Sequence, residues 1–394
     1  MSMATAKWKT AKLDELGFVG RGKSRHRPRN AAILYGGIYP FFQTGDIKAA
    51  NFYLTEFTQT YSEEGLAQSK LWNPGTLCIT IAANIAESAI LGIEGCFPDS
   101  VVGFVADPGK ADVRFIKYYM EILKLQMQSV SRGTTQDNLS VDKLLSFDFC
   151  VPPLPVQCRI AGILSAYDEL IENNQRRIRI LEDMARSLYR EWFVHFRYPG
   201  HELVPLVDSS LGQIPQGWEV KKLSEVLELN YGKALKKEDR REGEYPVFGS
   251  SGIVGMHDTA LVKGPGIIVG RKGNVGSVFW CDNDFFVIDT AYFVASSFPL
   301  RFLFYVLPTL NFINSDAAVP GLSRNQAYTL EILVPPILLL NQFCELAETF
   351  ERQSATLQRQ TANLRRTRDL LLPRLLSGQV SLTVSESELD EVMP

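Results

Sequence analysis

The chain has 394 residues, of which 45% are hydrophobic, and this length is sufficient for two or three domains with hydrophobic cores. Its formal net charge of −3 argues against non-specific binding of a polyanion by the whole molecule. The charge is nevertheless segregated into a basic run from Arg21 to Arg29 and an acidic C-terminal tail at 381–394, which we expect to be disordered.

Six cysteines stand singly along the chain, without a CxxC pair and without the neighbouring histidines that would complete a metal site. This usage predicts reduced, mostly buried thiols. The sequence shows no secretory signal peptide and no run of 18 apolar residues, so we expect neither export nor membrane insertion, and a cytoplasmic location.

Residues 1–153 are predicted to form a first mixed α/β domain. Short β-type runs are separated by Gly, Pro and Asn, and residues 114–130 then show helical spacing. The β-type runs lie at 39–43, 75–82, 88–93 and 100–106.

Two glycine-rich patterns in this domain suggest enzymatic chemistry, and both lack the expected context. Gly17 to Ser24 reads GFVGRGKS, which matches the phosphate-loop pattern GxxxxGK[ST], but the preceding segment is short and charged and Pro28 follows where a helix should begin. Phe18 to Gly22 also matches the FxGxG pattern of S-adenosylmethionine sites. The only Pro-Pro pairs, in VPPL and VPPI, lack the amide and the aromatic residue of an amino-methylating loop. We therefore predict neither nucleotide binding nor methyl transfer by this chain.

A long amphipathic helix is predicted from Pro155 to Trp192, within a spacer at 154–200. Apolar residues recur in steps of four and three, which is the pattern of a coiled-coil seam and requires a partner helix. The seam residues are Ile160, Leu164, Tyr167, Ile171, Asn174, Ile178, Leu181, Ala185, Leu188 and Trp192.

The partner helix lies in the same chain, because the sequence is an internal duplication. A shift of 183 residues places Val151-Pro152-Pro153 on Val334-Pro335-Pro336 and the first seam on a second one. Further upstream the shift rises through 191 and 206 to 210, so a second domain at 201–336 repeats the first with insertions. The second seam consists of Phe343, Ala347, Phe350, Ser354, Leu357, Thr361, Leu364, Arg368, Leu371 and Leu375.

The second helix is predicted from Leu338 to Leu372, stopped by Pro373, within a spacer at 337–380. Because domain two follows the first helix, the second helix must return antiparallel to bury its seam. Asn174 on the first helix and Ser354, Thr361 and Arg368 on the second make this seam polar in places, which favours one register over maximal stability.

This organisation resembles the specificity subunit of type I restriction–modification systems over nearly the whole chain. The resemblance is carried by RGTTQDNLS (Arg132 to Ser140) and AAVPGLS (Ala317 to Ser323), each followed by a VPP segment and a long helix. It is also carried by IPQGW from Ile214, GIIVGRKGNVG from Gly266 and LLLPRLLSG from Leu370.

The resemblance implies an α+β fold in which two mixed α/β target-recognition domains are separated by two long helices that form an antiparallel coiled coil. Each domain would read one half of a bipartite sequence in double-stranded DNA. The helices would set the gap between the half-sites and dock two modification (methyltransferase) subunits. No catalytic residue, metal or cofactor is then expected in this chain, since partner subunits bind S-adenosylmethionine, and ATP and Mg²⁺ where restriction subunits are present.

Candidate DNA-binding residues follow from the chemistry of base edges and phosphates. Arg and Lys suit guanine or phosphate, Asn and Gln suit adenine, and Ser and Thr hydroxyls suit either. In the first domain the candidates are Arg21, Lys23, Arg25, Arg27, Gln43, Thr44, Arg132, Thr134, Thr135, Gln136 and Asn138. In the second domain they are Lys233, Lys236, Lys237, Ser250, Ser251, Arg271, Lys272, Asn274, Arg324 and Asn325.

Several alternatives remain open on the sequence alone. The basic run could be a solvated loop, and the turns around Arg132 and Ala317 could lock each domain against its helix. The whole chain could also be a coiled-coil scaffold whose two domains bind proteins, or a methyltransferase acting alone.

Overall fold

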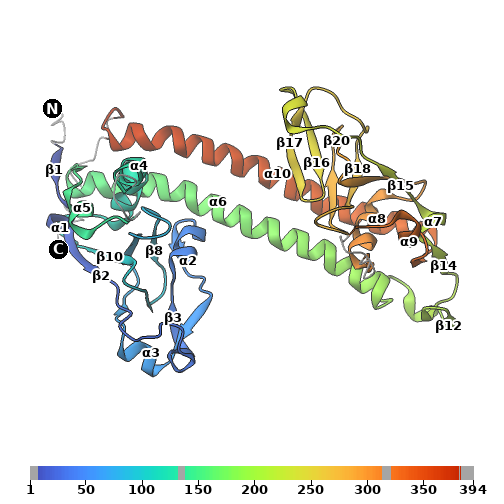
Figure 1. The fold of residues 1–394 in the computed structure, drawn as a ribbon, viewed down its shortest axis with the longest axis horizontal. Coiled ribbons are helices and arrows are strands. Elements are labelled where there is room, and N and C mark those ends of the chain that lie inside the picture. The colour runs from blue at the N-terminus through green and yellow to red at the C-terminus, as the bar shows by residue number, and fades with distance from the viewer. Residues whose placement is uncertain (1–7, 132–137, 313–320, 381, 383–394) are drawn as a thin grey trace. The chain divides into compact units, whose positions relative to one another are not determined.

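A computed structural model describes residues 8–131, 138–312, 321–380 and 382. The chain divides into two compact units, one formed by 1–176 with 358–394 and the other by 177–357. Each unit combines one globular domain with a segment of both long helices (Figure 1). In the described residues every helix is too short or too polar to cross a bilayer.

The domain of unit 1 contains three sheets. The main sheet has the order β2-β10-β7-β8-β4, with bounds Gly17–Arg21, Val101–Ala106, Leu77–Thr80, Ser88–Leu91 and Tyr53–Leu54. The second has the order β5-β3-β9-β6, with bounds Gln59–Tyr61, Tyr35–Phe41, Gly95–Cys96 and Leu71–Trp72. A two-stranded sheet pairs β1 (Lys9–Ala11) with β11 (Phe149–Val151). The helices are α1 (Leu13–Leu16), α2 (Thr44–Ala49), α3 (Glu63–Ala67), α4 (Val113–Ser131) and α5 (Val141–Ser146), and Ala32–Leu34 forms a 3₁₀ turn.

The predicted β-runs of this domain are confirmed as β3, β7, β8 and β10, and the predicted helix as α4. All four residues of β7 are buried, because α4 covers one face of the main sheet, while Ile47 of α2 and Trp72 of β6 share a core with Cys78 on the other. The main core joins Ile79 and Phe104 of the sheet to Phe115 and Met127 of α4.

The domain of unit 2 repeats this plan with one strand fewer in each of its two larger sheets. Its main sheet has the order β15-β21-β18-β19, with bounds Glu228–Tyr231, Ala291–Ala295, Gly266–Gly270 and Val278–Cys281. Its second sheet has the order β17-β16-β20, with bounds Gly252–His257, Tyr245–Gly249 and Phe286–Val287. Two-stranded sheets pair β14 (Glu219–Lys222) with β22 (Glu331–Val334), and β12 (Leu206–Ser209) with β13 (Gly212–Pro215). The helices are α7 (Leu223–Val226), α8 (Leu300–Val306) and α9 (Arg324–Ala327), with 3₁₀ turns at His201–Leu203, Lys237–Asp239 and Leu307–Thr309.

The duplication extends to individual backbone hydrogen bonds. Strand β3 pairs in parallel with β9, and β16 pairs in parallel with β20. The Leu139 N–H donates to the Ile81 carbonyl at 2.9 Å, just as the Leu322 N–H donates to the Arg271 carbonyl at 2.8 Å. The domains differ where α4, with 19 residues, is replaced by the seven-residue α8.

The long helices are α6 (Leu154–Tyr189), which continues into a π-helical turn at Arg190–Val194, and α10 (Ile337–Leu376). Every predicted seam position on both helices is buried or half-buried. The helices run antiparallel in unit 1, since Arg368 pairs with Asp168 while the later Leu375 shares a core with the earlier Ile160. In unit 2 the beginning of α10 lies beside the end of the first helix, where Phe343 packs on Phe193. The seam pattern did not predict the burial of Phe193, which the wider π turn places beside Trp192 in the core.

The predicted stop at Pro373 is wrong, because α10 continues through this residue to Leu376. A proline in a helix removes one backbone hydrogen bond and crowds the preceding turn. Here the last turn is kept by packing, since Leu375 and Leu376 are 2% and 3% exposed and belong to the core of unit 1.

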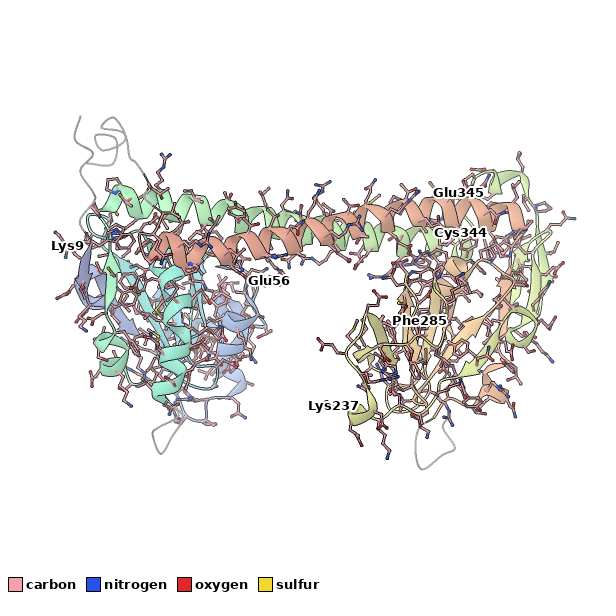
Figure 2. The ribbon with its side chains drawn as sticks, turned by 90° about the horizontal axis from the view of Figure 1, so that it is seen from above. Lys9, Glu56, Lys237, Phe285, Cys344 and Glu345 are labelled. Atoms are coloured by element: carbon pink, nitrogen blue, oxygen red, sulfur yellow. The ribbon has the colours of Figure 1, made fainter. Side chains whose placement is uncertain are left out.

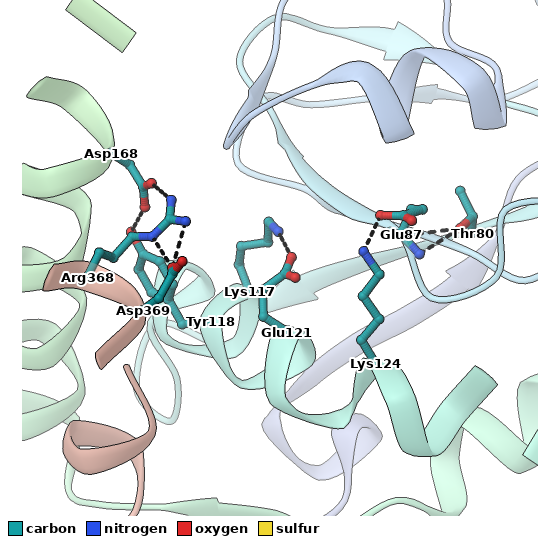
Figure 3. Close-up of polar contacts among 9 residues, drawn as sticks. All are labelled: Thr80, Glu87, Lys117, Tyr118, Glu121, Lys124, Asp168, Arg368 and Asp369. Atoms are coloured by element: carbon teal, nitrogen blue, oxygen red, sulfur yellow. Dashed lines mark hydrogen bonds and ion pairs between the residues drawn. The ribbon is translucent and has the colours of Figure 1, made fainter. Parts of the chain in front are cut away.

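An acid and a tyrosine anchor each domain to its own long helix. In unit 1 the Tyr118 hydroxyl of α4 donates to Asp168 Oδ2 of α6 at 2.5 Å, and Arg368 of α10 pairs with the other carboxylate oxygen (Figure 3). Burial and the Asp168 carboxylate raise the pKa of Tyr118 well above its ordinary value, so its hydroxyl remains a donor.

Unit 2 repeats this anchor 183 residues further along, on α10. The Tyr305 hydroxyl of α8 donates to Glu351 Oε1 at 2.9 Å, and Arg301 Nη1 lies 2.6 Å from Glu351 Oε2. Burial raises the pKa of Glu351. In this unit the arginine comes from the domain itself, because position 185, which corresponds to Arg368, is an alanine.

We expect Tyr118→Phe to lower the free energy of unfolding of unit 1 by about 1–3 kcal/mol, because a hydrogen bond to a buried carboxylate is lost. Tyr119→Phe is the matched control, since the Tyr119 ring packs on Phe115 and Phe149 and no hydrogen bond of its hydroxyl was found in the described residues. Hydrogen exchange of α4 and of the C-terminal part of α10 measures the effect locally. Equal exchange rates in the two variants would contradict the anchor.

Candidate nucleic-acid interface

The predicted basic loop of unit 1 has a defined conformation. It follows the edge strand β2, and the Gln68 side-chain oxygen accepts the backbone N–H groups of Arg25 and His26 at 2.6 and 3.0 Å. The Ser69 hydroxyl donates to the Lys23 carbonyl at 2.9 Å. The backbone of the loop therefore has a defined conformation, while the side chains of residues 25–30 are exposed, so the alternative of a solvated loop stays open.

Three of the basic side chains hold this loop together. Arg29 makes a two-oxygen contact with the Asp99 carboxylate at 2.9 and 2.8 Å, and Arg27 donates to two backbone carbonyls within the loop at 2.8 Å. Arg21 donates from Nε to the Asp99 carbonyl. No partner for the side chains of Lys23 and Arg25 was found among the described residues, and both are exposed. These two cations are thus available for an external anion.

An aromatic platform beside the loop was missed by the sequence reasoning. The Lys70 ammonium lies 3.6 Å from the ring centroid of Trp72 and 4.9 Å from that of Phe18, which is 57% exposed. Burial and the nearby charge of Lys23 lower the pKa of Lys70. The spacing of Lys70, directly before β6, and Trp72 within it was the available signal, but only the tertiary fold brings Phe18 to them.

The remaining candidates of unit 1 lie on other segments. Gln43 precedes α2 and donates from its amide to Gln59 at 2.7 Å, and Thr44 is the first residue of α2. Asn138 is exposed and bridges to Ala82. The candidates Arg132, Thr134, Thr135 and Gln136 lie outside the described residues.

In unit 2 two predicted arginines meet on a tyrosine that was not predicted. The guanidinium groups of Arg271 and Arg324 lie 4.9 and 5.2 Å from the ring centroid of Tyr231, which is 48% exposed. Arg271 also donates to the Asp289 carbonyl at 3.0 Å, and Arg324 Nε is buried without a partner in the described residues. Two cations are therefore concentrated around one exposed ring.

The buried Tyr292 packs against this cluster and contacts both Tyr231 and Arg271. It is 1% exposed, its hydroxyl donates to the Leu322 carbonyl at 3.1 Å, and Arg271 lies 5.8 Å from its ring. Burial and the hydrogen bond with Tyr231 raise the pKa of Tyr292 to about 12. Its hydroxyl is thus a permanent donor that fixes the strand carrying the cluster.

The other candidates of unit 2 are distributed around the same end of the domain. Lys233, Lys236 and Lys237 are exposed after β15, and Figure 2 shows Lys237 at the tip of the domain away from α10. The turn after β18 exposes Lys272 and Asn274, with Lys272 bridged to Gly321. The remaining three differ in exposure: Ser250 is buried, whereas Ser251 and Asn325 are exposed.

The phosphate-loop pattern is structural. Gly17–Arg21 is strand β2, paired with β10, and the following loop contains no α-helix. A side chain at Gly22 would place its Cβ 2.3 and 2.5 Å from the carbonyl oxygens of Pro98 and Phe97, so close backbone packing requires the glycine. This geometry lacks the strand, loop and helix arrangement of a phosphate-binding loop.

The described residues supply cations, amides and hydroxyls at strand ends, and no group of three or more His, Cys, Asp or Glu side chains suited to a metal occurs among them. Burial raises the pKa of the Cys96 thiol to about 11 and that of Cys344 to about 11, so these thiols are poor nucleophiles at neutral pH. Cations, amides and hydroxyls of this kind can bind anions and the polar edges of bases.

Comparisons of sequence and of structure with known proteins identify relatives of one kind. The family model described as type I restriction modification DNA specificity domain matches residues 5–183 and 215–338. The chain is 24% identical over 425 aligned positions to the type I restriction enzyme MjaIX specificity subunit of Methanocaldococcus jannaschii, covering 95% of this chain and 93% of that one. The corresponding values for the EcoprrI specificity subunit of Escherichia coli are 23% identity and coverage of 76% and 77%. The crystal structure of the S subunit from M. genitalium superposes with a TM-score of 0.65, at 17% identity and with 94% and 96% covered.

We expect Arg25→Ala to weaken DNA binding by the assembled complex and to reduce the slope of log affinity against log salt by about one, because one contact to a phosphate is lost. Arg27→Ala serves as a comparison, since its guanidinium is used inside the loop. Fluorescence titration at several salt concentrations measures both quantities. An unchanged affinity and salt slope for Arg25→Ala would remove this residue from the interface.

Proposed function

The chain belongs to the family of type I restriction–modification DNA specificity domains, and we propose that each of its two globular domains reads one half of a bipartite DNA target. The observation that carries this proposal is the concentration of positively charged side chains at strand ends in both domains. In unit 1 they follow β2, and in unit 2 they follow the corresponding strand β15 and also β18. A subunit that reads DNA needs such groups at both half-sites, because phosphates position the protein and base edges specify the sequence.

We further propose that α6 and α10 act as the spacer between the half-sites. The buried seam and the two acid–tyrosine anchors support this role, because they fix each domain to a rigid helical segment. Polar residues inside the seam favour one alignment of the two helices. Asn174 and Thr361 are such residues, because they are only 7% and 6% exposed and belong to the same unit. By the register of the Asp168–Arg368 pair they lie level with each other.

Docking of two modification subunits on the outer faces of the helices is also part of the proposal. Apolar side chains that are about half or more exposed occur on both helices and could contact a partner subunit. They are Leu170, Ile180 and Val194 on the first helix and its π turn, and Ile337, Leu338 and Leu370 on α10.

The catalytic chemistry belongs, in this proposal, to the partner subunits in the cytoplasm. They would bind S-adenosylmethionine and methylate adenine, and restriction subunits, where present, would use ATP and Mg²⁺. The strand conformation of the glycine-rich segment 17–21 supports this assignment, because a methyltransferase acting alone would need that segment as a cofactor loop.

Co-expression with a modification subunit tests the function. We expect co-purification of the two proteins and sequence-selective retention of DNA, with a bipartite methylated motif in the host genome by single-molecule sequencing. A stable complex that retains all DNA sequences equally and leaves no methylated motif would favour the protein-binding scaffold instead.

We expect a paired deletion of one heptad from both helices to shorten the tolerated gap while keeping both half-sequences. The segments are Asn174–Ile180 in α6 and, by the antiparallel register, Ala355–Thr361 in α10. Seven residues remove about 10 Å of helix at about 1.5 Å per residue, which equals about 3 base pairs at about 3.4 Å each. Methylome sequencing reads the gap directly.

Deletion of Asn174–Ile180 alone is the control for this experiment, because it misaligns the seam without shortening α10. An unchanged gap in a folded paired-deletion variant would show that the helices do not set the spacing.

A further inference from the structure

In each domain an arginine guanidinium donates a hydrogen bond to the backbone carbonyl of an equivalent aspartate. Arg21 donates to the carbonyl of Asp99 in unit 1, and Arg271 donates to the carbonyl of Asp289 in unit 2 at 3.0 Å. The two aspartates are equivalent, because each lies two residues before the strand that occupies the second position of its main sheet, β10 or β21.

The two arginines nevertheless lie at the ends of non-equivalent strands, because Arg21 is the last residue of β2 and Arg271 directly follows β18. Strand register pairs Arg21 with Val102 and Tyr231 with Tyr292, so Arg21 corresponds to Tyr231. The hydrogen bonds from Leu139 and Leu322 show in the same way that Ile81 corresponds to Arg271. The sequence repeat therefore hides the equivalence, which appears only when the side chains are placed in space.

We propose that this guanidinium is the guanine-reading contact of each domain, Arg21 for one half-site and Arg271 for the other. The inference rests on the proposed function and names the residue and the base edge that it uses. A guanidinium that donates one N–H to a fixed carbonyl keeps a second pair of donors in a defined plane. Such a fork matches O6 and N7 of guanine in the major groove.

Local contacts fix the plane of each guanidinium group before DNA binds. In unit 1 the bond to the Asp99 carbonyl comes from Nε, which leaves both terminal nitrogens of Arg21 for a ligand. In unit 2 the bond to Asp289 comes from Nη1, and the guanidinium lies over the ring of Tyr231. Tyr231 is therefore a positioning residue, and Arg324 on the same ring supplies a second positive charge for a neighbouring phosphate.

The decisive variants are Arg271→Lys and Arg21→Lys in the assembled complex, because lysine keeps the charge and removes the planar fork. We expect Arg271→Lys to weaken binding to the intact target about 5- to 100-fold and to have little effect on a target whose relevant guanine is replaced. The salt slope should change little, since the charge is kept. Arg21→Lys should relax one position in the other half-site only.

A transplanted arginine tests the spatial equivalence. Arg271→Ile combined with Tyr231→Arg rebuilds the arrangement of unit 1 in unit 2, so we expect it to recover selectivity that Arg271→Ile alone loses. Arg241→Ala is the matched control, because its side chain is 71% exposed and pairs with Asp258 in the same domain. Methylome sequencing and titration with single-base variants provide the readouts, and co-purification with the modification subunit checks folding.

Three results would overturn the inference: unchanged base preference in both lysine variants, an equal loss on every DNA sequence, or the same loss in Arg241→Ala. Each of these requires a wild-type complex that does select its target. A wild-type complex without any sequence selectivity would instead refute the proposed function, so the two failures are distinguishable. The lysine variants alone decide the guanine contact if the transplanted variant does not fold.

Discussion

The partly buried carboxylate on each long helix makes the interaction on which the placement of each domain on its helix depends. Asp168 and Glu351 occupy equivalent positions of the duplicated sequence, and each accepts a hydrogen bond from a tyrosine of its own globular domain. A carboxylate inside a protein is costly unless it is paired and hydrogen-bonded, so removing either partner carries a penalty. The anchor thereby favours a single orientation of each domain on its helix.

The arginine that completes each anchor shows how the two repeats diverged. In unit 1, Arg368 of α10 pairs with Asp168 and so ties the domain, α6 and α10 together at one point. In unit 2, Arg301 of the domain pairs with Glu351 and lies 3.5 Å from the Trp280 ring centroid. The first anchor also fixes the register of the helices, whereas the second fixes only the domain. A polar seam that includes Asn174 and Thr361 adds to this choice of register.

The candidate interface follows the same physical rule at the protein surface. Arginines are held by backbone carbonyls, a carboxylate or an aromatic ring before any ligand arrives, as the contacts of Arg21, Arg29 and Arg271 show. Pre-organised side chains lose less conformational entropy on binding than free ones. Lys23 and Arg25 differ, because they extend from a rigid loop without a partner in the described residues, and they suit the looser contacts that phosphates require.

By itself the sequence determined the duplication, four strands of the first domain (β3, β7, β8 and β10), both long helices, their seam and the family, because periodicity and repeated motifs are local or one-dimensional signals. It also identified most of the basic residues at strand ends. It did not reveal the end of α10, because burial of Leu375 and Leu376 outweighs the cost of Pro373. Only the tertiary structure decided that Phe18 lies beside Lys70 and Trp72, that Tyr231 lies between two arginines, and that Arg21 and Arg271 are equivalent. These relations join residues far apart in the sequence, and the equivalent arginines lie at the ends of non-equivalent strands, so no spacing within the sequence encodes them.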